Sequence, residues 1–341
     1  MMTRLCQLLG IEIPIIQAPI GHAASPELVA AVCETGALGM LSVTWREIPE
    51  IRRVIREIRD KTERPFGVNL VLEQGQDARL EACLEEGVRI ISFFWGDPAP
   101  YLARVHHAGG VVMHTVGSAA EACQHAGNGV DVIVAQGAEA GGHVWGQVST
   151  MALVPAAVDA AGPVPVIAAG GIADARGVAA ALALGASGVW MGTRFVATLE
   201  SAAHPAYKHA VLQAAETDTV YTTVFDRDWP DAPHRVLRNS TTEGSHSGVP
   251  GAPADRPGEG EVIGHYADGT PVIRYAADEP LADMNGEVEA MALYAGQSAA
   301  LVHDIPSASD LVPSLMNRSR EALSDALSRL QGDSAPAPAD R

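Results

Sequence analysis

The chain reads PVIAAGGIADARGVAAALALGASGVWMGTRF over Pro165–Phe195. Two apolar runs, Pro165–Ile172 and Gly188–Phe195, flank a segment with helical spacing that begins after Asp174, a good N-cap residue, and reaches Gly185. A buried strand, a helix and a second buried strand in this order are typical of parallel pairing, because parallel strands need a crossover connection. The stretch therefore predicts part of a parallel sheet.

Eight apolar runs of this kind occur in the first two thirds of the chain, each followed by a segment with helical character. They begin about 20 to 35 residues apart, the length of one strand, one loop and one crossover helix. Ser25 before Pro26, and Ser118 with Glu121 three residues later, are helix start signals. Eight consecutive units favour a closed (β/α)8 TIM barrel over an open doubly wound α/β sheet. The runs are Ile13–Ile20, Ala37–Val43, Phe66–Leu72, Arg89–Trp95, Gly110–Val116, Asp131–Gly137, Pro165–Ile172 and Gly188–Phe195.

The composition predicts a folded, acidic protein. Of the 341 residues, 47% are hydrophobic and 19% are charged, which gives enough apolar surface for a large core. The 23 Lys and Arg against 41 Asp and Glu give a net charge of −18, and an acidic surface repels nucleic-acid phosphates. The N-terminal residues lack the apolar run of a signal or membrane-spanning segment. We therefore expect a cytoplasmic protein with neither nucleic acid nor membrane as a partner.

The four cysteines are Cys6, Cys33, Cys83 and Cys123. They are widely spaced and form no CxxC pair, so neither a disulfide framework nor a metal site is predicted. We expect them to be small residues of the core.

The pattern changes after residue 215, where the predicted barrel, residues 1–215, ends. Residues 216–289 are predicted to be an insertion with short extended ribbons at Tyr221–Phe225 and Val272–Tyr275. The insertion also contains Thr241–Gly260, which is rich in Gly, Pro and Ser and makes a poor core element. Because such insertions commonly cover barrel mouths, we expect a lid.

Helical spacing returns at Val288–Val302 and at Ala308–Leu330. Residues 290–330 are therefore predicted to be C-terminal helices that pack back on the barrel. The tail 331–341, with its Ser-Ala-Pro-Ala-Pro-Ala run, has nothing to bury and is expected to be disordered.

Glycines lie near the ends of the last two predicted strands. Gly170 and Gly171 close the seventh run, and Met191, Gly192 and Thr193 occur in the eighth. Glycine lets backbone N–H groups approach a ligand closely, and the loops after strands seven and eight are the usual phosphate site of barrel enzymes. The alternative is that the glycines only permit tight turns. Two such turns on adjacent strands favour phosphate binding.

The sixth run ends in Gln136-Gly-Ala-Glu-Ala-Gly-Gly-His143. Small residues beside an imidazole at a strand end indicate a backbone on which a flat ligand can lie, and histidine is the commonest acid/base residue near neutral pH. His143 is therefore the candidate catalytic residue, against the alternative of a structural histidine. Asn69, within the third run, Gln17, before Ala18-Pro19, and Gln136 are polar residues whose side chains need partners. A cofactor or neighbouring backbone groups would equally supply them.

These motifs together resemble the nitronate monooxygenase family, formerly the 2-nitropropane dioxygenases, whose members are FMN-dependent barrels. The similarity covers about residues 5–305 and includes Tyr294-Ala-Gly-Gln297-Ser298. The matching motifs are Ile15-Ile-Gln-Ala-Pro19, Asn69, Gln136–His143, Ala169-Gly-Gly-Ile172 and Met191-Gly-Thr-Arg-Phe195.

The resemblance implies FMN as cofactor, with its phosphate held by backbone amides of Gly171, Gly192 and Thr193. It also implies that His143 faces the reactive edge of the flavin. Further cofactor-binding residues implied by the family are Gln17, Ala18, Pro19, Asn69, Gln136, Gly141, Gly142, Gly170, Met191 and Gln297.

The sequence departs from the family pattern near the substrate pocket. Trp145 intervenes where many members have Gly-Gly-His-x-Gly, and Gly21-His22 follows the first strand where relatives often have Met and small residues. We therefore assign His22, Trp95 and Trp145 to the substrate pocket.

The activity implied by the resemblance is oxidation of alkyl nitronates by dioxygen to a carbonyl compound and nitrite. His143 would remove a carbon-bound proton from a nitroalkane or, when protonated, pair with the anionic nitronate. FMN-type enoyl-acyl-carrier-protein reductases and NAD(P)H:quinone reductases share the Gly-Gly-His and Ala-Gly-Gly-Ile motifs and form a second enzyme hypothesis. A noncatalytic flavin-binding protein is a third. A homodimer is the oligomer considered.

Overall fold

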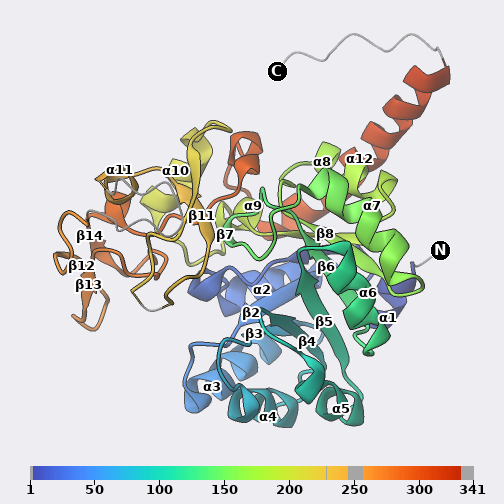
Figure 1. Ribbon diagram of the computed structural model, residues 1–341, viewed down its shortest axis with the longest axis horizontal. Coiled ribbons are helices and arrows are strands. Elements are labelled where there is room, and N and C mark those ends of the chain that lie inside the picture. Colours follow the sequence, from blue (N-terminus) through green and yellow to red (C-terminus); the bar gives the residue numbers. More distant parts are fainter. Residues whose placement is uncertain (1–2, 228, 245–255, 332–341) are drawn as a thin grey trace.

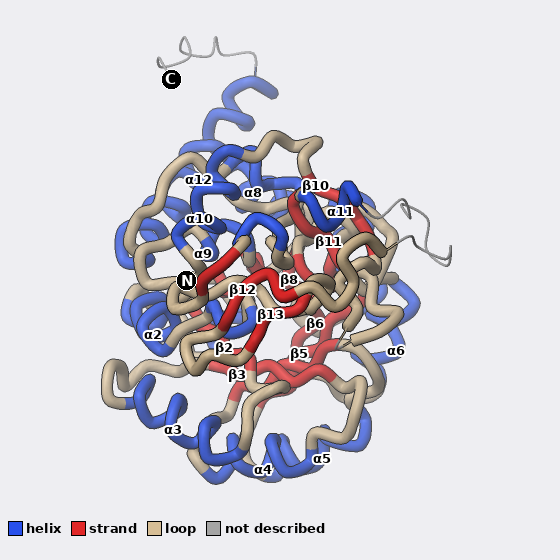
Figure 2. The backbone as a smooth tube through the Cα atoms, turned by 90° about the vertical axis from the view of Figure 1, so that its left-hand side faces the viewer, coloured by secondary structure: helices blue, strands red, loops and turns tan. Residues whose placement is uncertain are grey.

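The computed structural model describes residues 3–227, 229–244 and 256–331. Eight parallel strands form a closed barrel, in which β1 pairs with both β2 and β9. Figures 1 and 2 show the barrel strands with the helices around them. The predicted (β/α)8 barrel is confirmed. Its strands are β1 (Ile15–Gln17), β2 (Leu38–Ser42), β3 (Gly67–Val71), β4 (Ile90–Phe94), β5 (Val111–Val116), β6 (Val132–Gln136), β8 (Val166–Ala169) and β9 (Gly188–Met191).

Each barrel strand lies inside its predicted run but is shorter. In the eighth run, Thr193–Phe195 belong to a short helix, α9 (Thr193–Val196), that begins directly after Gly192. A short strand that follows β6 was not predicted. The two-residue β7 (Gly142–His143) leaves the barrel and pairs with β11 (His234–Leu237) of the insertion.

Helices surround the barrel, and their ends follow the sequence signals. Ser25 accepts a hydrogen bond from the Leu28 N–H at the start of α2, and Asp174 accepts from two N–H groups at the start of α8. Ser118 caps α6 in the same way. The helices are α1 (Arg4–Leu9), α2 (Pro26–Glu34), α3 (Ile48–Arg59), α4 (Asp77–Glu85), α5 (Ala99–His107), α6 (Ala119–Gly127), α7 (Thr150–Ala161), α8 (Ala175–Ala183) and α10 (Pro205–Gln213).

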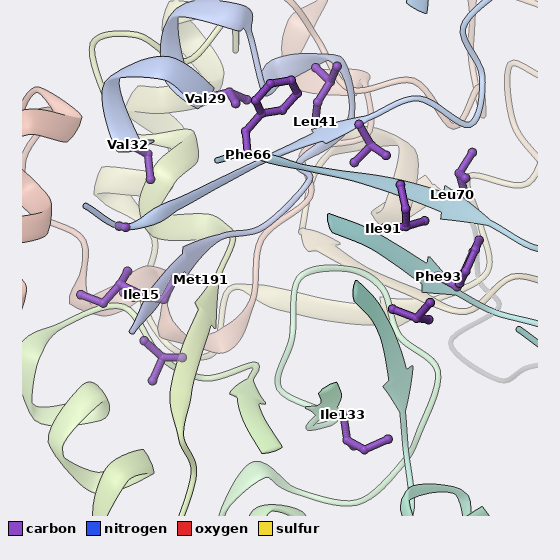
Figure 3. Packing of buried hydrophobic residues seen from close by; sticks show 14 of the residues in the cluster. Ile15, Val29, Val32, Leu41, Phe66, Leu70, Ile91, Phe93, Ile133 and Met191 are labelled. Atoms are coloured by element: carbon purple, nitrogen blue, oxygen red, sulfur yellow. The ribbon is translucent and has the colours of Figure 1, made fainter. Parts of the chain in front are cut away.

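Alternate residues of each strand face two different core layers. Met40 and Met113 lie in the layer inside the barrel, where Leu5 and Leu9 of α1 join them and close its N-terminal end. Leu41 and other outward-facing residues pack against the helices (Figure 3). This alternation matters for the site, because it decides which residue at each strand end can reach the barrel mouth.

The insertion forms two small sheets. One contains β10 (Thr219–Thr222), β11 and β7, and the other contains β12 (Val262–His265), β13 (Pro271–Ile273) and β14 (Asn285–Gly286). β10 overlaps the predicted ribbon Tyr221–Phe225, and β13 overlaps the predicted ribbon Val272–Tyr275. A short helix, α11 (Ser240–Gly244), overlaps the start of Thr241–Gly260, of which residues 245–255 lie outside the described residues.

The predicted helix over Val288–Val302 is wrong. This segment contains only two 3-10 turns, η2 (Val288–Ala290) and η3 (Gln297–Leu301), separated by extended residues that run beside the barrel mouth. The last helix, α12 (Ala308–Gln331), begins as predicted and packs on α8 and α2, while its C-terminal half projects away from the body (Figure 1). The predicted disordered tail lies outside the described residues beyond Gln331.

Three cysteines are buried as expected, but Cys123 is exposed on α6, so its assignment to the core is wrong. Within the described ranges, no three His, Cys, Asp or Glu side chains are grouped to hold a metal ion. No helix in those ranges has the length and apolar character needed to cross a membrane.

Candidate active site

A cavity of about 370 Å³ lies at the C-terminal ends of the barrel strands. Residues that end or follow the barrel strands form its wall, and the insertion and the segment before α12 complete it. This is the working end of such barrels. Twelve of the predicted site residues line the cavity, namely Ala18, Pro19, His22, Asn69, Gln136, Gly141, Gly142, His143, Gly170, Gly171, Gly192 and Thr193.

Gln17 and Met191 do not line the cavity, because strand alternation turns their side chains elsewhere. The Gln17 amide is fully buried and bonded to Met40 of the adjacent strand: the Met40 N–H donates to Oε1, and Nε2 donates to the Met40 carbonyl, both at 3.2 Å. Met191 is buried between the barrel and its helices, whereas its neighbour Trp190 lines the cavity. Neither predicted side chain reaches a ligand there.

The Gln297 side chain is exposed and also lies outside the cavity lining. Its segment is nevertheless close to the site, because Gly296 packs directly against Gly141, and a Cβ on Gly141 would lie 2.5 Å from the Ala295 carbonyl carbon. The Gly296 N–H donates to Thr193 Oγ1 at 3.0 Å. The sequence motif therefore marks close backbone packing at Gly296 rather than a side-chain contact from Gln297.

Trp95 and Trp145 do not line the cavity, and their ring centroids lie 4.7 Å apart. Trp145 is 38% exposed, and its Nε1 donates to Glu121 Oε1 at 3.0 Å. Trp95 has a φ of +63°, which costs a residue other than glycine about 1–3 kcal/mol. Gln136 fixes the loop that runs from β6 to Trp145, since its Nε2 donates to the His143 carbonyl at 3.0 Å and its Oε1 accepts from the Trp145 N–H at 2.9 Å.

The predicted glycine turns border the cavity. Gly170 and Gly171 have φ values of +91° and +72°, which explains glycine at both positions. Gly192 has a negative φ and serves as the N-cap of α9, and a Cβ there would make only ordinary contacts, 3.5 Å from Ile20 and 3.6 Å from Ala18. The space at Gly192 is therefore open towards the cavity.

His143 lies on the cavity wall inside a cage of rings. The Trp229 ring stacks on the imidazole with centroids 4.1 Å apart and an interplanar angle of 29°. The rings of Trp95, Tyr294 and His234 surround the same imidazole at 5.4 to 6.4 Å. His143 Nε2 is buried and has no hydrogen-bond partner among the described residues.

Burial in this cage, with a smaller contribution from His234, lowers the pKa of His143 to about 3. His234 is itself neutral, because burial lowers its pKa to about 4. The His234 Nε2 accepts from the Phe225 N–H at 3.3 Å, which leaves its Nδ1 as the N–H that donates to the Ala232 carbonyl at 2.9 Å. Both imidazoles are therefore uncharged near neutral pH.

Several residues that sequence analysis did not assign also lie at the site. Trp229, Asp278 and Glu279 come from the insertion, and Tyr294 comes from the segment before α12. The Trp-Pro turn at Trp229 was a visible signal, since an isolated tryptophan in a Gly/Pro-rich insertion needs a burial site. Among the described residues that line the cavity, none is Lys or Arg.

The family model for nitronate monooxygenase matches residues 2–318. The chain belongs to the nitronate monooxygenase family. It is an enzyme of this family and an oxidoreductase.

Three similar proteins have different names. A "Nitronate monooxygenase" from Pseudomonas aeruginosa is 34% identical over 90% of this nitronate monooxygenase family member and 97% of its own length. A "(3aS,4S,5R,7aS)-5-hydroxy-7a-methyl-1-oxo-octahydro-1H-indene-4-carboxyl-CoA dehydrogenase" from Mycobacterium tuberculosis is 36% identical over 98% of each chain. The solved structure of FabK from Thermotoga maritima has a TM-score of 0.78 and 32% identity, covering 97% of this chain and 98% of that chain.

Proposed function

We propose that the protein uses FMN to oxidise nitroalkanes or their nitronates with dioxygen, giving a carbonyl compound and nitrite. When bound, FMN supplies the electron transfer between substrate and dioxygen. The observation that carries the proposal is His143, a neutral imidazole with an unpaired buried Nε2 on the wall of the barrel-mouth cavity.

The lining fits a flavin with a phosphate. The cavity volume falls within the range of cofactor pockets. No described lining residue is Lys or Arg, which supports a phosphate held by backbone N–H groups, and those of Gly171, Gly192 and Thr193 would hold it. The residues that would lie along the ring and ribityl chain are Ala18, Pro19, Asn69, Gln136, Gly141, Gly142 and Gly170.

Gly192→Val tests the phosphate position. We expect the variant to fold, because its φ suits any residue, but its FMN affinity should fall by about tenfold or more, equivalent to ~1.4 kcal/mol. The measurement is the ratio of flavin to protein absorbance after purification, followed by titration with FMN. Gly127→Val on α6, where a Cβ would meet nothing, is the matched control. Wild-type affinity in a folded Gly192→Val protein would move the phosphate elsewhere.

The protonation state of His143 selects between its two hypothesised roles. A group with a pKa of about 3 is neutral near pH 7, so it cannot pair as a cation with a nitronate. A neutral imidazole can accept the carbon-bound proton of a nitroalkane. We therefore assign His143 as the proton acceptor, with Trp229 and Tyr294 excluding water from it.

The insertion remains a proposed cover for the substrate side of the cavity. Its strand β11 pairs with β7, which carries His143, and its Trp229 lies on the imidazole. Thr241, however, is buried and donates to the Ala290 carbonyl at 2.7 Å, so the start of the Gly/Pro-rich run belongs to the folded body. His22, in the turn after β1, also lines the cavity beside Glu279 of the insertion and is the remaining candidate for substrate contact among the predicted residues.

A second candidate is a flavin-dependent reductase or dehydrogenase that acts on an acyl thioester and exchanges electrons with NAD(P)H. The observation that favours it is the lining, which is rich in aromatic rings and lacks Lys and Arg among its described residues. Such a wall suits a neutral apolar substrate better than a small anion. The Mycobacterium tuberculosis relative, named as a CoA-ester dehydrogenase, supports the same candidate.

Anaerobic mixing separates the two candidates. We expect the flavin absorbance of the FMN-loaded protein to bleach with nitroethane or ethyl nitronate and to persist with NADH or NADPH. After air is admitted, nitrite should accumulate only in the sample with the nitro compound. Bleaching by NAD(P)H alone, without nitrite formation from either nitro compound, would replace the leading proposal with the second.

A further inference from the structure

Glu279, from the insertion, places a carboxyl group in the cavity wall. Glu279 lines the cavity, and its side chain is 13% exposed. One of its oxygens, Oε1, accepts hydrogen bonds from the backbone N–H groups of His22 and Ala23, the latter at 3.2 Å. The carboxyl group is therefore anchored through one oxygen.

The segment around Glu279 is held on both sides. The Tyr294 hydroxyl donates to the Ala277 carbonyl at 2.7 Å, and the His204 N–H donates to the Pro280 carbonyl at 2.9 Å. A Cβ on Gly21 would overlap the carboxyl group, so glycine at that position makes room for it. These contacts place Glu279 as a built feature of the cavity rather than as a surface side chain.

We propose that Glu279 is a further catalytic residue, which in its protonated form donates a hydrogen bond from its carboxyl group to an oxygen atom of the bound substrate. This inference rests on the proposed function, because nitro and nitronate oxygens are the acceptors. A donor is needed there, since negative charge moves onto these oxygens as the carbon-bound proton leaves and no lining Lys or Arg is described.

The burial of Glu279 favours its protonated form. Burial, the largest influence, raises the pKa of Glu279, and Asp278 acts in the same direction. The charge of His22, whose Nδ1 lies 3.9 Å from Oε1, and the backbone N–H groups that donate to the carboxyl group act in the opposite direction. Tyr207 is the other titratable group beside it, and burial raises the pKa of that phenol. A neutral base at His143 and a neutral acid at Glu279 would divide the two proton-dependent roles between two residues.

Three variants test the role in the FMN-loaded full chain. Glu279→Gln keeps a neutral donor, so it should retain kcat/KM within several-fold but lose the decline in activity that wild type shows as the pH rises through the pKa of Glu279. Glu279→Leu should lose about a hundredfold in kcat, the usual cost of one such donor. Asp278→Asn, the matched control, should keep the alkaline decline but move it to lower pH, because Asp278 raises the pKa of Glu279. An alkaline decline that persists in Glu279→Gln would overturn the proposal.

Measurements that need no turnover test the role of Glu279 independently of the proposed function. The infrared spectrum at pH 7 should contain a carboxylic-acid C=O band that is missing in Glu279→Gln. The unreactive 2-methyl-2-nitropropane, which has no α proton, should bind wild type and Glu279→Gln but bind at least tenfold more weakly to Gly21→Ala, where the methyl group displaces the carboxyl group. If wild type does not turn over nitro compounds, the proposed function fails while this band still reports on Glu279. Absence of the band would overturn the proposal even in an active enzyme.

Discussion

His143→Asn is expected to lose about 10² to 10⁴ of the wild-type kcat/KM on a neutral nitroalkane, the usual contribution of a general base. The substitution keeps a polar side chain of similar reach inside the ring cage but removes the proton acceptor. The loss on the matching nitronate should be much smaller, because that substrate arrives already deprotonated. Stopped-flow reduction of the flavin by nitroethane and by ethyl nitronate gives both numbers directly.

A control variant and the comparison of the two substrates decide what a loss of activity in His143→Asn means. His234→Asn changes the neighbouring imidazole, which is committed to backbone groups and lies outside the cavity lining, so it should not discriminate between the two substrates. Equal losses on nitroalkane and nitronate in His143→Asn would show that His143 orients the flavin or substrate instead of accepting a proton. Full activity on both would make His143 a structural residue and leave His22 as the next candidate.

Trp229→Ala is expected to raise the pKa of His143 from about 3 towards its ordinary value of 6.5, because water would reach the imidazole. The active form of the base is the neutral one, so activity is present above the pKa and lost as the pH falls through it. The acid limb of kcat/KM should therefore move from near pH 3 into the range between pH 3 and 6.5. Trp229→Phe keeps a ring over the imidazole and should leave the acid limb near its wild-type position.

The same substitution should lower the free energy of unfolding by about 3–5 kcal/mol, since Trp229 is only 5% exposed. Stability and titration can be separated by recording thermal unfolding at pH 7 and the His143 resonances by NMR across the pH range. An unchanged His143 pKa in a folded Trp229→Ala protein would mean that Tyr294 and His234, rather than Trp229, exclude water from the imidazole.

The barrel was predictable because each of its strands is an uninterrupted apolar run with its own helix and cap. β7 was not, since a two-residue strand has no periodicity and pairs only with a strand nearly a hundred residues later. The helix predicted over Val288–Val302 failed for a related reason. Its apolar spacing is real, but Gly296 must lie extended against Gly141, and tertiary packing overrides local propensity.

Some residues of the candidate site could likewise be predicted from the sequence, and others could not. Local motifs predicted the glycine turns, Asn69 and His143, all of which line the cavity. Gln17 and Met191 could not be excluded, because a motif does not show towards which face a residue at a strand end turns. Trp229 and Glu279 were missed because the insertion brings them to the cavity from far away in the chain, through contacts that no local pattern encodes.

The pairing of β7 with β11 has an evolutionary consequence. His143 sits on a strand that belongs to the small sheet of the insertion, while the glycine turns belong to the barrel. Mutations in the insertion can therefore reshape what approaches the base while the barrel keeps its inherited architecture. Such modular divergence would allow one ancestral scaffold to give rise to relatives that carry names as different as monooxygenase and CoA-ester dehydrogenase.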